Sequence, residues 1–273
     1  MPGGLARAIL AGVDCSALAV LAGADRRSDL PRLGGMARAD GVVIASERFW
    51  AFARRDGTLR EGTMPRPPRL LRRVPLLRGL IRLGLALTPL FGGSGVARRR
   101  ERLLLFAALF APLLLLFLPH SWSLWLGLAT TAVLLAWLLR GRTLFLHGAE
   151  HRAIAAAEES SLVETWKGRV RPSRFSPRCG TNFAALVLPV SIGADRIWPL
   201  ATAVYTPFVV TLVSLALTME LWQVVQTSRS RVARVFLLPG LALQRLTTRE
   251  PSGEETQIAL TAVASVIRRE SAI

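Results

Sequence analysis

The sequence predicts a mainly α-helical, polytopic membrane protein with about four spans and a small N-terminal β-containing segment. Hydrophobic residues make up 51% of the 273 residues and charged residues only 19%, which is more apolar sequence than a soluble domain of this size needs. Long runs without charge are flanked by arginines. The net charge is +17, almost entirely from arginine, since Lys167 is the only lysine. The apolar content excludes intrinsic disorder, and two cysteines exclude a disulfide scaffold.

The segments before the spans are expected to be cytoplasmic or interfacial. Residues 1–33 form a partly ordered leader. Residues 34–64 hold short strands, because β-branched and aromatic runs surround an Asp-Gly turn signal. Residues 65–98 form a basic interfacial or re-entrant helix, in which Arg78 and Arg82 share one helical face.

Two regions of the chain are expected to supply the four membrane spans. Residues 103–139 form a transmembrane hairpin, because Leu103–Leu118 and Trp122–Leu139 carry no charge. As helices these runs are about 25 Å long, close to one hydrocarbon thickness. Residues 183–222 supply the third and fourth spans, and the third is short or tilted because Asp195 and Arg196 interrupt the apolar run.

The arginines predict the orientation and the partners. They cluster before the hairpin, in the loop of residues 140–182 and after the last span. By the positive-inside rule, both termini and this loop lie on the cytoplasmic side of a bacterial inner membrane. Residues 223–273 form a cytoplasmic amphipathic segment and helix. The expected partners are the lipid bilayer and an unknown substrate. No nucleic acid is expected, because no aromatic-rich recognition module accompanies the arginines, and a homo-oligomer is left open.

A metal-binding pattern stands in the middle loop. Two of the three histidines lie in His147-Gly148-Ala149-Glu150-His151, an H-x-x-E-H pattern. On a helix, His147 and His151 are one turn apart on the same face and can share one divalent ion, while Glu150 is the candidate catalytic base that activates water. The alternative is that the two histidines are an exposed surface pair that binds no metal ion.

Two residues compete to be the third ligand. Glu158 lies two turns beyond His151 on the same helical face, and Cys179 stands at the foot of the third apolar segment. Glu158 could instead be a solvated surface carboxylate, and Cys179 a small buried side chain. Three protein ligands would leave a fourth position for water, which zinc makes acidic. Iron or manganese could take the same ligands.

The expected function is therefore that of a metal-dependent membrane enzyme, a hydrolase acting at the cytoplasmic membrane face on an unknown substrate. A non-catalytic membrane scaffold with a structural metal site is the alternative, because the cysteine and the histidines lie on separate segments. A transporter is the weakest hypothesis, since the spans contain almost no ionisable residue beyond Glu220, near the end of the fourth.

Four motifs resemble the bacterial multi-pass membrane family known as domain of unknown function 1385, sometimes described as predicted metal-dependent enzymes. The motifs are His147 to His151 followed by Glu158, Arg178 to Thr181 with Asn182 and Phe183, Pro75 to Gly79, and Pro239 to Leu241 followed by Gln244 to Pro251. The resemblance implies a membrane architecture and a bound metal, but no substrate.

The chain departs from the family pattern at two places. The family's G-G-Q-A-V-I-E-G stands here with Met36 and Asp40 in place of its glutamine and glutamate. A histidine that the family places two residues before its Arg-Cys pair is Ser176 here. If that histidine binds metal in the family, this chain has one ligand fewer.

Polar residues around the two late motifs are further candidates to line the site. They could close over the metal or bind an anionic head group, or they could merely cap helices and face solvent. These residues are Arg178, Thr181, Gln244, Arg245, Thr248, Arg249 and Glu250.

Overall fold

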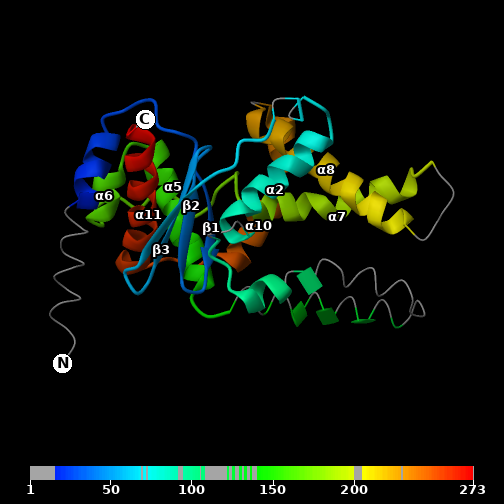
Figure 1. Ribbon diagram of the computed structural model, residues 1–273, viewed down its shortest axis with the longest axis horizontal. Coiled ribbons are helices and arrows are strands. Elements are labelled where there is room, and N and C mark those ends of the chain that lie inside the picture. The colour runs from blue at the N-terminus through cyan, green and yellow to red at the C-terminus, as the bar shows by residue number, and fades with distance from the viewer. Residues whose placement is uncertain are drawn as a thin grey trace. The chain divides into compact units, whose positions relative to one another are not determined.

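The computed structural model describes residues 16–272, with gaps at 69, 72, 92–94, 200–204 and 229 and only scattered residues between 105 and 139. The chain divides into two compact units (Figure 1). The first combines three pieces of the chain, Met1–Arg66, Gly141–Cys179 and Gln244–Ile273. The second combines Pro67–Arg140 and Gly180–Leu243.

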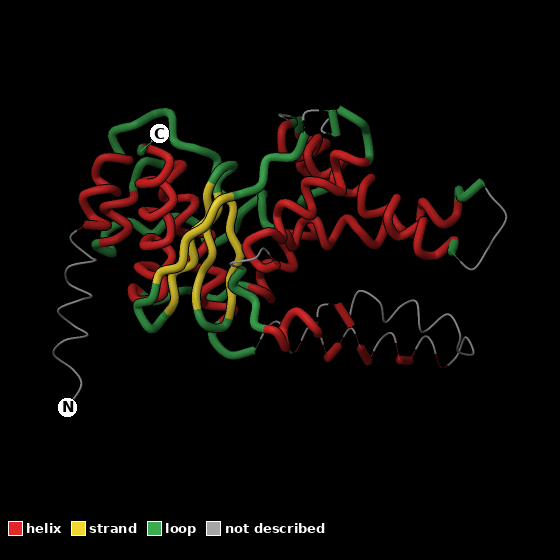
Figure 2. Tube along the Cα trace, viewed as in Figure 1, coloured by secondary structure: helices red, strands yellow, loops and turns green. Residues whose placement is uncertain are grey.

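The first unit contains a four-stranded antiparallel sheet in the order β1-β2-β3-β4, drawn in yellow in Figure 2. The strands are β1 (Gly34–Arg38), β2 (Gly41–Ala45), β3 (Phe49–Arg54) and β4 (Leu59–Thr63). Each strand pairs with the next one along the chain, which is the simplest topology for strands joined by short turns. The β2–β3 pair is buried on both faces, so a β-branched and aromatic run forms its centre.

Two long helices pack on one face of this sheet. They are α5 (Thr143–Glu158) and α11 (Gly253–Ser271), and both contact the strands and each other. The core joins small residues of α5 and α11 to the strand residues Val42, Ile44, Ala51 and Ala53. Many of these helix residues are alanines, which let helix and sheet backbones approach closely. The short helix α6 (Leu162–Trp166) and the helical residues 16–24 complete the unit.

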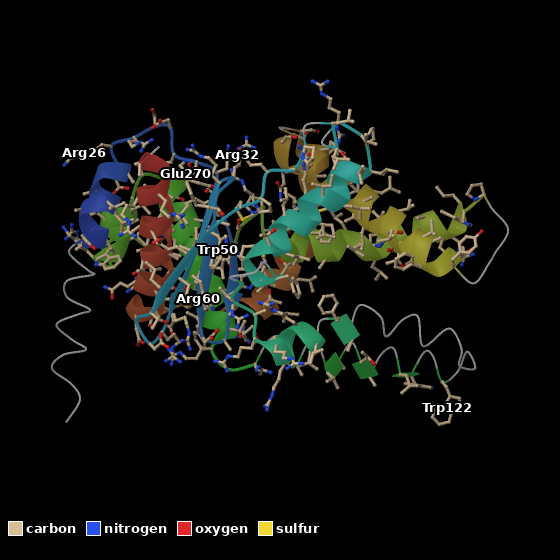
Figure 3. All side chains as sticks on the ribbon, in the orientation of Figure 1. Arg26, Arg32, Trp50, Arg60, Trp122 and Glu270 are labelled. Carbon is tan, nitrogen blue, oxygen red and sulfur yellow. The ribbon has the colours of Figure 1, made fainter. Side chains whose placement is uncertain are left out.

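Polar contacts fix the two ends of α11. At its start Ser252 and Glu255 form a capping box, which satisfies backbone N–H groups of the first turn. Near its end Glu270 accepts hydrogen bonds from Ser46 at 2.5 Å and Arg48 at 2.7 Å. Glu270 is labelled in Figure 3, together with Trp50 on β3. The last helix of the chain is thereby attached to the β2–β3 turn.

The second unit is helical in its described part. It contains α2 (Leu77–Phe91), α7 (Gly180–Arg196), α8 (Thr206–Thr227), α9 (Arg231–Val235) and the first turns of α10 (Leu238–Thr247). Both α2 and α7 pack against α8. Arg78 of α2 binds Glu220 of α8 through two hydrogen bonds of 2.7 and 2.6 Å. Gly79 faces the α8 backbone so closely that a Cβ atom would lie 2.8 Å from the carbonyl oxygen of Ala216.

The predicted four-span helical membrane fold is wrong. In the described part of the chain, one helix, Phe208–Thr227 within α8, is long and apolar enough to cross a membrane. Its most apolar window is only 33% buried. The predicted third span forms α7, which has 17 residues and includes Pro189, Asp195 and Arg196.

The physical reason for the error lies in the third apolar run, because Asp195 and Arg196 fall inside α7 and leave an apolar stretch too short to cross a bilayer. The predicted hairpin of residues 103–139 lies almost entirely outside the described residues, as do residues 1–15 of the predicted leader.

Candidate metal centre

The centre lies on α5, which carries His147 and His151 one helical turn apart. Most of α5 is buried because it packs on the sheet and on α11. The two imidazole rings meet edge to face, with their centroids 4.5 Å apart and their planes at 65°. Helical spacing therefore brings both rings to one point, as the H-x-x-E-H pattern requires.

Each ring is oriented by a backbone carbonyl. The Nδ1 atom of His147 lies 2.9 Å from the carbonyl oxygen of Thr247, and the Nδ1 atom of His151 lies 2.6 Å from that of Arg174. A carbonyl only accepts, so both Nδ1 atoms carry the proton and both Nε2 atoms keep a lone pair. Metal-binding histidines are commonly held in this way.

Cys179 completes a group of three ligand atoms. Its Sγ atom lies 3.2 Å from the Nε2 atom of His147. The ligand atoms of His147, His151 and Cys179 all lie within 4.8 Å of one another, so the cluster could hold a metal ion. We call these three residues the His-Cys cluster. Imidazole nitrogen and thiolate sulfur are ligands that Zn²⁺ prefers.

The electrostatics of the cluster suit a cation. His151 is 1% exposed, and its buried Nε2 atom has no hydrogen-bond partner among the described residues. Burial, together with the neighbouring His147, lowers the pKa of His151 to about 4, and burial also lowers the pKa of His147. Both rings are therefore neutral at pH 7, which is the form that binds metal. An orphaned buried nitrogen is a cost that a bound ion would remove.

The Glu150 carboxyl lies apart from the cluster, against strand β1. Gly35 leaves the space for it, because a Cβ atom there would lie 2.7 Å from the Glu150 Cγ atom. The carboxyl accepts a hydrogen bond from the backbone N–H of Ala37, and burial raises its pKa to about 8. Glu150 is not one of the three clustered ligands, and its role as a base stays a prediction.

Of the two candidates for the third ligand, the structure brings Cys179 rather than Glu158 into the cluster. Glu158 forms an ion pair with Arg178. Both side chains are about half exposed, at 48% and 44%. Arg178, the residue before Cys179, is thus held by an ion pair at the C-terminal end of α5.

The loop that carries Cys179 is held by a buried amide. Gln244, fully buried, accepts from the Ser176 N–H at 2.8 Å and donates to the Ser176 carbonyl at 2.7 Å. The hydroxyl of Thr248, also fully buried, donates to the Gln244 carbonyl oxygen at 2.7 Å. Gln244 and Thr248 thus shape the backbone near the cluster without entering it.

The other predicted site-lining residues lie elsewhere. Arg245 and Arg249 are exposed, and Arg249 donates to the Arg245 carbonyl at 3.2 Å. Glu250 is 56% exposed and pairs with Arg152. Thr181 belongs to the first turn of α7 in the second unit.

Two residues that sequence reasoning did not single out organise the site. The buried Arg152 donates to the carbonyl oxygens of Pro172 and Pro251 at 3.3 and 3.4 Å and to Glu250 at 2.5 Å. It thereby joins α5 to both segments whose carbonyls orient the histidines. Gly148 lets the late segment approach, because a Cβ atom there would lie 2.2 Å from the Arg249 carbonyl oxygen. Its place directly after His151, on the helix that carries the H-x-x-E-H pattern, was the available signal for Arg152.

The comparisons with known proteins support the family resemblance over the half of the chain that carries the cluster. Residues 139–269 match the family described as protein of unknown function (DUF1385). The chain is 30% identical over 132 residues to an uncharacterized protein, YqhQ, of Bacillus subtilis (strain 168). That alignment covers 46% of this chain and 40% of the relative. No solved structure matches the chain.

Proposed function

We propose that this protein is a zinc-dependent hydrolase of the bacterial inner membrane, with the metal bound by the His-Cys cluster. The observation that carries the proposal is the convergence of two oriented Nε2 atoms and one thiol within 4.8 Å. A mixed imidazole and thiolate set favours zinc over manganese, which prefers oxygen ligands, and ferrous iron is the second choice.

Three protein ligands are typical of catalytic rather than structural zinc, because the fourth position remains open for water. Bound zinc lowers the pKa of such a water towards neutrality and supplies a nucleophile for ester, amide or phosphoester bonds. The chain itself orients the ligands through the Thr247 and Arg174 carbonyls. The proposal needs no proton transfer by Glu150, whose carboxyl lies against β1.

The membrane part of the proposal depends on α8. This helix has the length and composition to cross a bilayer, and several of its large apolar side chains are exposed, Val224 among them at 62%. The arginines of the middle segment, which carries Cys179, favour the cytoplasmic side for the cluster.

A structural metal site in a non-catalytic scaffold is the second candidate. It is favoured by the origin of the ligands, since α5 supplies the histidines and a separate loop supplies Cys179. An ion bound there would fasten the loop to the helix. A closed shell of four protein ligands would support this candidate, and a water ligand would support the hydrolase.

The test begins with elemental analysis of the full-length protein purified in detergent. The wild type should carry about one zinc per chain, and His151→Ala and Cys179→Ser should carry much less. His120→Ala and Cys15→Ser are matched controls at residues outside the described part of the chain, and they should keep the metal. Absence of stoichiometric metal from the wild type and both controls would refute the proposal.

Activity separates the two candidates. The metal-loaded protein is assayed with p-nitrophenyl acetate and p-nitrophenyl phosphate, before and after chelation and after return of zinc. Turnover that follows the zinc content and disappears in His151→Ala supports the hydrolase. A full metal complement with neither substrate hydrolysed, together with X-ray absorption that shows four protein ligands, supports the scaffold.

A further inference from the structure

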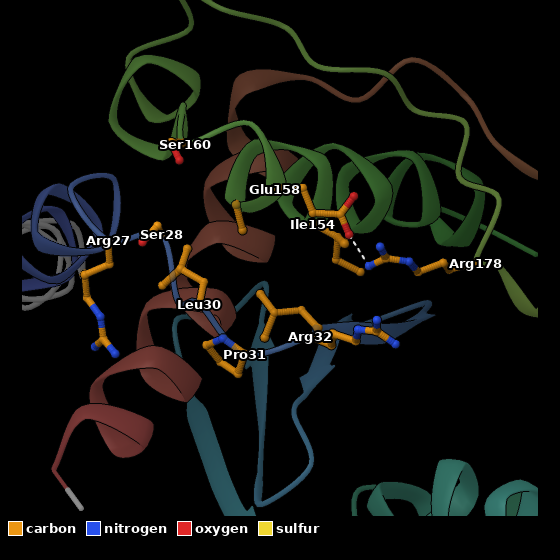
Figure 4. Close-up of a pocket in the computed structure, with 11 residues that line it drawn as sticks. Arg27, Ser28, Leu30, Pro31, Arg32, Ile154, Glu158, Ser160 and Arg178 are labelled. Atoms are coloured by element: carbon orange, nitrogen blue, oxygen red, sulfur yellow. Dashed lines mark hydrogen bonds and ion pairs between the residues drawn. The ribbon is translucent and has the colours of Figure 1, made fainter. Parts of the chain in front are cut away.

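A polar pocket lies in the first unit beside the C-terminal half of α5, with a cavity volume of about 260 Å³ (Figure 4). Its lining comes from three segments: the chain before β1, the end of α5, and Arg178 of the cysteine loop. The charged side chains of the lining are Arg27, Arg32, Arg178 and Glu158. Because Asp29 pairs with Arg27 and Glu158 pairs with Arg178, three guanidinium groups stand against two carboxylates and leave an excess of one positive charge.

The three arginines of the pocket lining differ in their ion-pair partners. Arg27 forms an ion pair with Asp29, and Arg178 forms one with Glu158. Arg32 is exposed and has no ion pair or hydrogen bond to another described residue. In Figure 4 the Arg32 and Arg178 side chains lie toward the same end of the pocket, where a dashed line marks the Arg178–Glu158 ion pair, whereas Arg27 lies at the other end. An unpaired guanidinium beside one paired with a local carboxylate is a suitable setting for a dianion.

The pocket and the His-Cys cluster are near neighbours along the chain. Ile154 and Glu158 of the pocket lie three and seven residues beyond His151 on α5, about 4.5 and 10.5 Å along the helix axis. Arg178 immediately precedes Cys179. One molecule of modest size could therefore occupy the pocket with one end and reach the cluster with the other.

We propose that this pocket binds a phosphate monoester group through Arg32 and Arg178. In the structure, the Glu158 carboxylate pairs with Arg178 at the position that the phosphate would take. Binding of the phosphate therefore displaces Glu158 from Arg178. Once Glu158 is displaced, a phosphate dianion has the charge to pair with both Arg32 and Arg178, and it can accept bidentate hydrogen bonds from guanidinium groups. The assignment of this ligand as part of a substrate rests on the proposed hydrolase function. Binding of the anion does not depend on the metal.

The test measures binding of inorganic phosphate to the full-length, chelator-treated protein by isothermal titration calorimetry. Arg32→Gln should weaken binding about tenfold or more, the usual scale for loss of a charge-assisted contact. Because Arg32 has no partner among the described residues, its loss should leave folding intact. Glu158→Gln should tighten binding severalfold, because it frees Arg178. Arg26→Gln is the matched control, since Arg26 is exposed and outside the pocket lining, and it should change affinity less than twofold.

A second arm uses short-chain phosphatidic acid with phosphatidylcholine as its control. If phosphatidic acid binds more tightly than inorganic phosphate and Arg32→Gln weakens both, the phosphate belongs to a lipid headgroup; the reverse order indicates a soluble phosphate. The proposal is overturned if the wild type binds neither ligand, if Arg32→Gln binds as the wild type does, or if binding needs zinc. Phosphate binding in a protein without zinc would preserve this inference even if the hydrolase proposal fails.

Discussion

The buried carboxyl of Glu150 should make the metal-free protein less stable as the pH rises. Its pKa is about 8 in the folded protein against 4.5 for an unburied glutamate, so the folded state binds the proton more tightly. Stability from this group is complete below pH 4.5 and is lost as the pH rises towards 8. Glu150→Gln keeps the shape, remains neutral and can still accept from the Ala37 N–H, and it should remove this loss.

The magnitude follows from the pKa shift. Between pH 6.5 and 7.5 the cost rises by about 1.4 kcal/mol, since each pH unit within the shifted range is worth about that much. The histidines act in the opposite direction, because their lowered pKa values remove stability as the pH falls from 6.5 towards 4. The histidines contribute equally to the wild type and to Glu150→Gln, so the difference in stability between the two proteins isolates Glu150. For a chain of this size, the melting temperature of Glu150→Gln minus that of the wild type should grow by about 3–6 °C from pH 6.5 to pH 7.5.

Thermal unfolding in detergent with a chelator, followed by tryptophan fluorescence, measures this effect. The melting temperature of Glu150→Gln should not fall from pH 6.5 to 7.5, and at pH 7.5 it should be higher than that of the wild type. Glu159→Gln, which removes an exposed carboxylate at the end of the same helix, should retain the wild-type slope. A difference in melting temperature between Glu150→Gln and the wild type that stays constant from pH 6.5 to 7.5 would refute the reasoning.

Three further variants test the surroundings of the cluster. Gly148→Ala should destabilise the fold by about 2 kcal/mol or more, because its Cβ atom would meet the rigid Arg249 carbonyl, and chemical denaturation measures the loss. Arg152→Leu should cost about 2–4 kcal/mol in the same assay, since two buried carbonyl oxygens lose their donor; a cost below 0.5 kcal/mol would contradict this. Gln244→Leu should lower zinc affinity at least about tenfold in a chelator competition, because the loop before Cys179 loses both of its amide contacts.

The sequence predicted the short strands of residues 34–64 because turn signals and β-branched runs are local. It did not predict that α5 and α11 would pack on this sheet, because their burial depends on contacts between distant segments of the chain. Of the predicted spans, only the fourth forms a helix, α8, that is long and apolar enough to cross a membrane within the described residues. An apolar run therefore does not by itself fix the length of the helix that it forms.

The histidine pair could be predicted because helical spacing alone brings the two rings together. The choice between Glu158 and Cys179 depended on the path of a loop, so sequence left it open. Other motif residues proved to be packing residues. Gly240 lies so close to Asn182 that a Cβ atom would be 2.1 Å from its side-chain oxygen. Residue spacing can show which side chains share one face of a helix. It cannot show where two distant segments of the chain approach each other, which only the three-dimensional structure reveals.

The order of the first unit's pieces along the chain has a consequence for biosynthesis. The carbonyl that orients His147 belongs to Thr247, and the core under α5 is completed by α11. A ribosome must therefore synthesise the chain through α11, including all of the second unit, before the histidines acquire their final environment. A nascent chain that stops before Gln244 would hold His147, His151 and Cys179 but would lack the Thr247 carbonyl and the α11 packing that fix His147 and α5.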